Sequence, residues 1–235
     1  MTVSVFDLFK PGVGPSSSHT MGPMPAAVRF VALLREQGLL DRVTRVGVKL
    51  YASLALTGRG HATDRAALLG LMGFEPATLD PDAGDAALAA LRTGGRLRLG
   101  GAGGPEIAFD EAIDIIWAGR ERLPQHPNAM TFTAFAGEAV AAERTYFSVG
   151  GGFVRDEDEI FRNTGDEEGP KEPYPFESGA ELLAMAAAAG LTVGQLMMAN
   201  ETVRRPQAEV IAGLDAIHAA MEACMAANVR ENRPK

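Results

Sequence analysis

The sequence predicts an α/β (α+β) N-terminal domain with a mixed sheet, followed by an all-helical C-terminal segment. Strand-like and helical hydrophobic periods follow one another over the first part of the chain, then an acidic stretch with several glycines and prolines appears, and only helical periods remain after it. We therefore expect a domain at 1–155, a solvated acidic linker at 156–175 and a helical segment at 176–235.

The first elements alternate between helix and strand. Met21 to Gly38 has apolar residues at helical spacing, prolines in its first turn and a terminal glycine. Thr44 to Ala52 alternates as a half-buried strand does. The turn Thr57 to His61 then precedes a second helix from about Thr63 to Met72, with Thr63 or Asp64 as the expected N-cap.

The middle of the chain is rich in β-forming residues, and the end is helical. A short helix and a short strand are expected first, at Ala83 to Leu91 and Arg96 to Leu99. Three extended stretches are expected at Ile107 to Trp117, Ala129 to Phe135 and Glu138 to Val149. Ser178 and Glu181 have capping-box spacing, and helices are expected near 178–189, 192–203 and 207–228.

Composition limits the partners. With 22 Lys+Arg against 30 Asp+Glu the formal charge is −8, and no basic run interleaved with aromatics appears, so we expect no nucleic-acid partner. The uncharged stretch Leu182 to Asn200 is interrupted by glycines and polar residues, so two packed helices explain it better than a membrane span. The start of the chain lacks the order of a signal peptide, and the expected location is the cytoplasm.

The single cysteine limits metal chemistry. Cys224 alone cannot make an internal disulfide or an all-cysteine zinc or iron–sulfur site, so we expect no metal ligand set in this chain. We interpret Cys224 as a buried core thiol and His218, in the last helix, as a packing residue.

Two histidine motifs precede helices. The segment 14–20 places Ser16, Ser17, Ser18 and His19 where a helix dipole is positive, which favours binding of a carboxylate or phosphate. The alternative is that these hydroxyls simply cap the helix. His61 also precedes a helix, where a neutral imidazole is favoured and can act as a base. A surface histidine without catalytic duty is the alternative, and the shared design of the two motifs favours function.

Two further loops have simpler interpretations. The segment Ser148 to Phe153 could cradle a phosphate, as in pyridoxal-phosphate lyases, but such an enzyme needs a Schiff-base lysine. The lysines Lys10, Lys49, Lys171 and Lys235 lie in no convincing motif, so we prefer a tight glycine turn and expect no pyridoxal phosphate. Leu123 to Asn128 is another polar loop, where prolines can fix the turn.

Five segments together resemble the single-chain bacterial iron–sulfur L-serine dehydratases, in order and in spacing. They are Ser4 to Lys10, Gly14 to Thr20, Leu56 to Asp64, Tyr146 to Phe153 and Pro173 to Phe176. The resemblance covers essentially the whole chain: the β domain of the family to about residue 155, then the first helices of its α domain.

The resemblance implies deamination of L-serine to pyruvate and ammonium, with a [4Fe-4S] cluster whose open iron binds the substrate hydroxyl. It makes His61 and His19 the catalytic residues, with His61 as the base that removes the Cα proton. Five side chains would hold the carboxylate and ammonium of serine: those of Ser16, Ser17, Ser18, His19 and Thr63. It also implies a homodimer and a place in amino-acid catabolism and gluconeogenesis.

The cluster cysteines of the family lie later in the α domain, and this chain lacks them. We therefore expect the chain alone to be incomplete and inactive, with a missing α-domain segment or chain as its partner. The alternative is a non-catalytic module: the β domain of the family resembles a small-molecule regulatory domain of some phosphoglycerate dehydrogenases, so the chain could bind serine or another anion without turnover.

Overall fold

The computed structural model describes residues 4–161 and 170–231. The chain forms two compact units, one of residues 12–162 and one of residues 1–11 with 163–235. The sequence analysis groups residues 1–11 with the first domain, and the structure groups them with the C-terminal helices. The reason is a buried carboxylate: Glu201 accepts hydrogen bonds of 2.8 Å from the Ser4 hydroxyl and 2.8 Å from the Val5 N–H.

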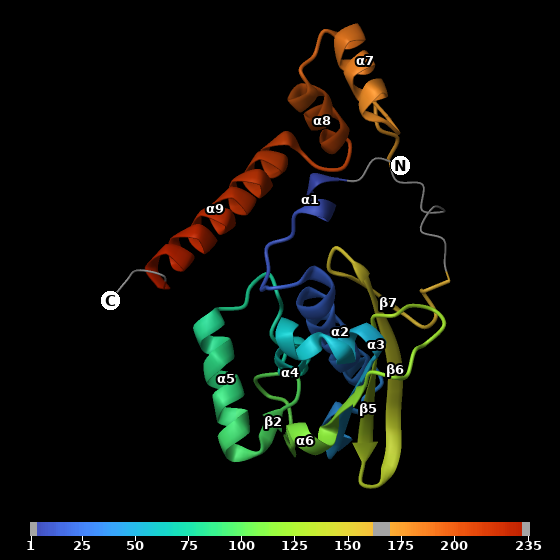
Figure 1. The fold of residues 1–235 in the computed structure, drawn as a ribbon, viewed down its shortest axis with the longest axis vertical. Coiled ribbons are helices and arrows are strands. Elements are labelled where there is room, and N and C mark those ends of the chain that lie inside the picture. Colours follow the sequence, from blue (N-terminus) through green and yellow to red (C-terminus); the bar gives the residue numbers. More distant parts are fainter. Residues whose placement is uncertain (1–3, 162–169, 232–235) are drawn as a thin grey trace. The chain divides into compact units, whose positions relative to one another are not determined.

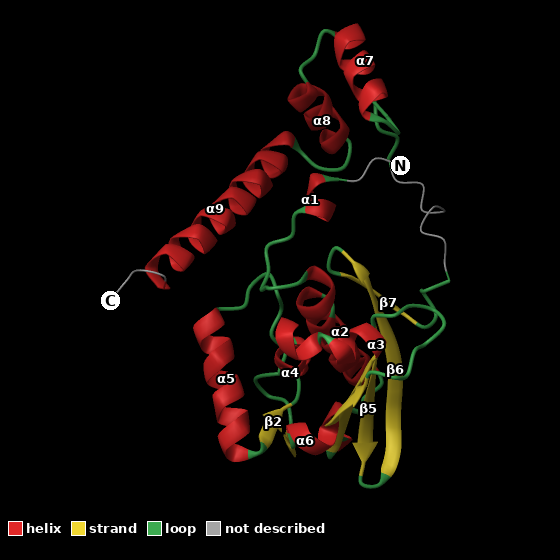
Figure 2. Ribbon diagram, in the orientation of Figure 1, coloured by secondary structure: helices red, strands yellow, loops and turns green. Residues whose placement is uncertain are grey.

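A five-stranded mixed sheet forms the basis of the larger unit (Figure 2), which confirms the predicted fold class. Its order is β4-β1-β5-β6-β7, with β1 parallel to β4 and all other neighbours antiparallel. The strands are β1 (Arg45–Tyr51), β4 (Ile115–Ala118), β5 (Ala129–Ala136), β6 (Ala139–Gly150) and β7 (Phe153–Asp156). A separate hairpin joins β2 (Arg96–Arg98) to β3 (Glu106–Ala108).

Helices pack on one face of this sheet (Figure 1). They are α2 (Pro23–Glu36), α3 (Ala52–Leu56) and α4 (Thr63–Leu71), with helical turns η1 (Ser17–Met21), η2 (Leu40–Arg42) and η3 (Gly58–His61). The helix α5 (Pro81–Gly94) packs against α4 and β2 instead. Alternate β1 residues, Val46, Val48 and Leu50, are buried in the core between sheet and helices. Phe30 of α2 stacks on Phe132 of β5 at 5.6 Å between ring centroids, which ties the helix to the sheet.

Several local predictions for the larger unit are wrong. Ile107 to Trp117 is not one extended stretch, because α6 (Glu111–Asp114) interrupts it, with the Asp110 carboxylate accepting from the Ala112 N–H. The N-cap of α4 is Ala62, without a side-chain cap, and not Thr63 or Asp64. The helix expected at 83–91 extends over 81–94, since Asp80 caps it and Pro81 begins it.

The acidic residues that open the expected linker belong to the larger unit. Asp156 accepts hydrogen bonds from the N–H groups of Asp158 and Glu159 and lies 3.2 Å from Arg144 of β6. Arg29 of α2 contacts Glu159 at 2.9 Å. These contacts fold the acidic turn back onto β6 and α2, so composition alone places the start of a linker too early here.

The smaller unit consists of α1 (Val5–Leu8), α7 (Gly179–Ala189), α8 (Val193–Thr202) and α9 (Gln207–Glu231). The Ser178 hydroxyl caps α7 at the Glu181 N–H, but the Glu181 carboxylate accepts from the Glu177 N–H, so half of the predicted capping box forms. Of the helices described, none alone is long and apolar enough to cross a membrane; α7 and α8 together meet the length and composition criteria, but they are bent by 93°. Cys224 and His218 are both exposed on α9, so their interpretation as buried or packing residues is wrong.

We expect Gly70→Ala to destabilise the larger unit, although alanine normally favours a helix over glycine by roughly 1 kcal/mol. A Cβ at Gly70 would lie 2.7 Å from Ala27 Cβ and closer still to the Met24 carbonyl oxygen, so α4 and α2 would have to separate. Such overpacking costs roughly 1–3 kcal/mol. Gly94→Ala is the matched control, because nothing lies within 4 Å of an added Cβ there. Urea unfolding that ranks both variants equally would contradict this account.

Candidate active site

The structure brings the two histidine motifs together. His19 lies in η1, immediately before α2, and His61 ends η3, immediately before α4. Their ring centroids are 5.0 Å apart and the rings are tilted by 44°. The two histidines are 42 positions apart in the sequence (61 − 19). Their imidazoles nevertheless form one site at the starts of two packed helices.

Two threonine hydroxyls join the motifs reciprocally. Thr20 donates to the His61 carbonyl at 2.7 Å, and Thr63 donates to the His19 carbonyl at 2.7 Å. Both side chains are buried, with 3% of Thr20 and 0% of Thr63 exposed, so water competes little for these bonds. Thr63, predicted to contact substrate, thus holds the backbone of His19 in this structure and does not face solvent.

Hydrogen bonding selects one tautomer of His61. Its Nδ1 lies 2.9 Å from the Thr57 carbonyl oxygen. A carbonyl can only accept, so Nδ1 carries the hydrogen and the neutral ring keeps its lone pair on Nε2. The side chain is half-buried. His61 therefore has an oriented ring with a basic nitrogen at the opposite end.

His19 is held at both ring nitrogens. Nδ1 lies 2.8 Å from the Ser18 hydroxyl, and Nε2 lies 3.1 Å from the Ser53 hydroxyl and 3.3 Å from its carbonyl oxygen. Burial lowers the pKa of His19, the contact with the Ser53 backbone raises it, and the nearby His61 lowers it again, with a net lowering. This environment favours a neutral imidazole.

The three serines of the loop have different surroundings. Ser16 accepts from the His19 N–H at 3.3 Å, so the capping alternative holds for this residue. Ser18 is engaged with His19. Ser17 is exposed, and its side chain makes no hydrogen bond to any residue that the structure describes. Ser17 is thus the serine most available to an incoming anion.

Ser53, which the sequence analysis missed, enters the site through unusual backbone geometry. Ala52 and Ala62 have φ values of 36° and 53°, a region that non-glycine residues rarely adopt. They lie on either side of the segment that carries Ser53, Thr57 and His61. Strained residues persist where the surrounding structure enforces them, often at functional sites. The positive φ angles of these two alanines support the assignment of this segment to a site.

The glycine loop and the polar loop meet each other at the ends of β5 and β6. Ser148 N–H donates to the Asn128 carbonyl at 2.9 Å, and the Asn128 side chain donates back to the Ser148 carbonyl at 3.4 Å. The predicted tight glycine turn is confirmed, since Gly150, Gly151 and Gly152 all have positive φ.

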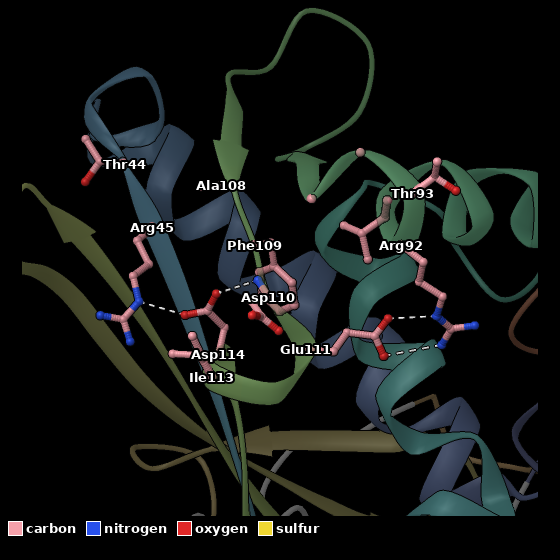
Figure 3. Close-up of a pocket in the computed structure, with 13 residues that line it drawn as sticks. Thr44, Arg45, Arg92, Thr93, Ala108, Phe109, Asp110, Glu111, Ile113 and Asp114 are labelled. Carbon is pink, nitrogen blue, oxygen red and sulfur yellow. Dashed lines mark hydrogen bonds and ion pairs between the residues drawn. The ribbon is translucent and has the colours of Figure 1, made fainter.

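A separate open hollow of about 890 Å³ lies beside the start of β1 and the end of α5 (Figure 3). Its two arginines are already paired: Arg45 with Asp114 at 2.7 Å and Arg92 with Glu111 at 2.7 Å. None of the predicted site residues lines this hollow. Because its positive charges are compensated, it is a poorer anion site than the serine loop.

The donor set of this chain does not fit a [4Fe-4S] cluster. Such a cluster is held by several cysteine thiolates, and the sequence contains one cysteine, which is exposed on α9. Across residues 4–161 and 170–231, no group of three or more His, Cys, Asp or Glu side chains could hold a metal ion.

Comparison of the sequence with known proteins identifies its family. Residues 4–159 match the family described as "Serine dehydratase beta chain". The chain is 45% identical over 226 residues to an L-serine dehydratase of Streptomyces coelicolor, covering 96% of this chain and 49% of the relative. It is 41% identical over 223 residues to L-serine dehydratase 1 of Escherichia coli, covering 95% of this chain and 48% of the relative.

The match extends beyond the sheet-containing unit. Because it covers 96% and 95% of this chain in the two relatives, it includes the C-terminal helices. The chain nevertheless spans about half the length of the curated relatives that it matches. The family match over residues 4–159 and the identity to these relatives show that the chain belongs to the serine dehydratase beta chain family.

Proposed function

We propose that this chain supplies the base and the substrate-binding part of an active site that deaminates L-serine to pyruvate and ammonium. The observation that carries the proposal is the His19–His61 pair, fixed by reciprocal threonine hydrogen bonds, with Nε2 of His61 free to accept a proton. The names of the relatives support L-serine as substrate.

His61 is the proposed base. Its Nε2 takes the proton from Cα of serine, while the Nδ1–H bond to Thr57 keeps the ring oriented and stabilises the positive charge that develops. Loss of this proton and of the β-hydroxyl, which together make one water, leaves aminoacrylate. Its tautomer hydrolyses to pyruvate and ammonium. His19, kept neutral by burial, adds no positive charge next to the base.

The serine loop is the proposed carboxylate site. It precedes α2, whose helix dipole favours an anion; Pro23 and Pro25 in the first turn have no N–H, so the hydroxyls of the loop are the donors. Ser17 is exposed there, and Ser16 and Ser18 fix the loop around His19. In this geometry Thr63 positions the loop from beneath, and its earlier assignment as a substrate contact stays a prediction.

The [4Fe-4S] cluster that the family resemblance implies does not fit the residues of this chain. We propose that a missing α-domain segment or chain holds it, and we assign to this chain only proton transfer and substrate binding. The length of the relatives supports such a partner, since they are about twice as long as the matched region. A cytoplasmic location and a homodimer belong to the same proposal.

A regulatory module that binds serine without turnover is the competing function. Both classes need the serine loop, but only the enzyme needs a base with the fixed tautomer of His61. The discriminating experiment is an anaerobic assay of pyruvate formation after iron–sulfur reconstitution, with and without a separately supplied α domain. Pyruvate formed only with the α domain supports a divided active site.

In a complete enzyme made by joining this chain to the second half of a relative, we expect His61→Ala to lower kcat by at least roughly a hundredfold. The reason is loss of the group that accepts the Cα proton. Iron content should not change. His218→Ala, an exposed histidine on α9, is the control and should keep normal turnover. Near-normal kcat for His61→Ala would transfer the role of base to His19.

We expect the double substitution of Ser17 and His19 by alanine to raise the Kd for L-serine in the same complete enzyme by roughly tenfold or more, since hydrogen bonds to a charged group are lost. Thr93→Ala, at an exposed position of α5, is the control. Calorimetric titration with L-serine and a competing carboxylate measures the effect. Unchanged affinity in the double variant would reduce the loop to a helix cap.

We expect the isolated chain to fold but to remain colourless and inactive after anaerobic addition of iron and sulfide, because Cys224 can provide one thiolate only. Iron, acid-labile sulfide and pyruvate are measured on the purified chain. Cys224→Ser is the control and should behave identically. A stoichiometric cluster with turnover in the isolated chain would refute the proposed division of the site.

A further inference from the structure

Ser148 has a buried hydroxyl without a partner. Ser148 is 0% exposed. Among the buried side-chain oxygens and nitrogens of the described residues, Ser148 Oγ is the one without a hydrogen-bond partner. Leaving such a group unsatisfied costs stability, because its hydrogen bonds to water are lost on folding and not replaced. Such an unsatisfied hydroxyl needs an explanation that packing does not supply.

The hydroxyl faces Gly22, between the serine loop and α2. A Cβ added at Gly22 would lie 2.6 Å from Ser148 Cβ and closer still to Ser148 Oγ, so the oxygen is the part of the side chain nearest to Gly22. Gly22 follows the serine loop and is the N-cap of α2, a helix of 14 residues. An unpartnered donor and the positive end of a helix therefore face the same place.

The backbone of Ser148 is fixed from its other side. Its N–H and its carbonyl are both bonded to Asn128, at 2.9 Å and 3.4 Å. The Asn128 N–H in turn donates to His126 Nδ1 at 3.1 Å. The polar loop thus holds Ser148 in place, which gives that loop a function beyond fixing a turn.

We propose that Ser148 is a ligand-contacting residue of the serine-loop site, and that its hydroxyl donates to a carboxylate oxygen of a small amino acid bound at the start of α2. This inference rests on the proposed function, which places a substrate carboxylate there. Solvent does not reach the hydroxyl in this structure, so binding includes a small displacement of the serine loop from β6. A charge-assisted hydrogen bond formed in these surroundings is strong.

The test uses the whole chain and two matched serine-to-alanine variants. Ser148→Ala removes an unsatisfied hydroxyl, so its Tm should rise by roughly 2–4 °C. Ser4→Ala removes a buried hydroxyl that donates to Glu201, so its Tm should fall. The Kd for L-serine, from calorimetric titration, should rise roughly tenfold or more in Ser148→Ala. A gain in stability together with a loss of affinity marks a ligand contact.

Each other outcome has a definite meaning. A fall in Tm for Ser148→Ala shows that the hydroxyl already has a partner, such as an internal water molecule, and overturns the inference. A rise in Tm with unchanged Kd shows an unsatisfied group with no ligand role and overturns it too. If the wild-type chain itself does not bind L-serine, the proposed binding function of the chain fails first, and the inference about Ser148 falls with it.

Discussion

The reciprocal bonds between two threonines and two histidine carbonyls are the constraint on which the site depends. Each threonine follows one histidine closely in sequence and donates to the backbone of the other. Because the acceptors are main-chain carbonyls, the bonds fix the loops themselves and leave both imidazoles free for other contacts. The close packing of α2 on α4 at Gly70 also holds together the two helices that follow the histidine motifs. Loss of the threonine bonds or of this helix packing would let the histidines separate.

The sequence predicts the fold class, most elements and the two histidine motifs, because hydrophobic period and helix-start signals are local. It does not predict the contacts between the motifs. Ser53, which hydrogen-bonds His19, directly follows Ala52, and the positive φ of Ala52 has no signal in the sequence. The sequence predicts Thr63 as a substrate contact or a helix cap. Its burial depends on the packing of α4 and cannot be predicted from the local sequence. The exposure of Cys224 does not follow from the sequence, because burial depends on what packs against a helix and not on the helix itself.

The larger unit contains most of the family match and the residues proposed to take part in catalysis. The sheet, the serine loop and the proposed base His61 lie in the larger unit, which contains nearly all of the family match. The thiolates that an iron–sulfur cluster needs are not encoded in these residues. In the proposed enzyme, the residues that accept the proton and bind the carboxylate would therefore lie in a different part of the protein from the cysteines that hold the cluster. The regulatory alternative would keep the first set and dispense with the second.

The short separation of the two imidazoles sets how many protons the site can store. Burial lowers the pKa of His19, and the nearby His61 lowers it further, so a proton on His61 opposes a second proton on His19. In the proposed reaction the two imidazoles together therefore accept one proton. After each turnover that proton must leave to solvent or product before the next serine can be deprotonated, so proton release becomes an obligatory step of the catalytic cycle.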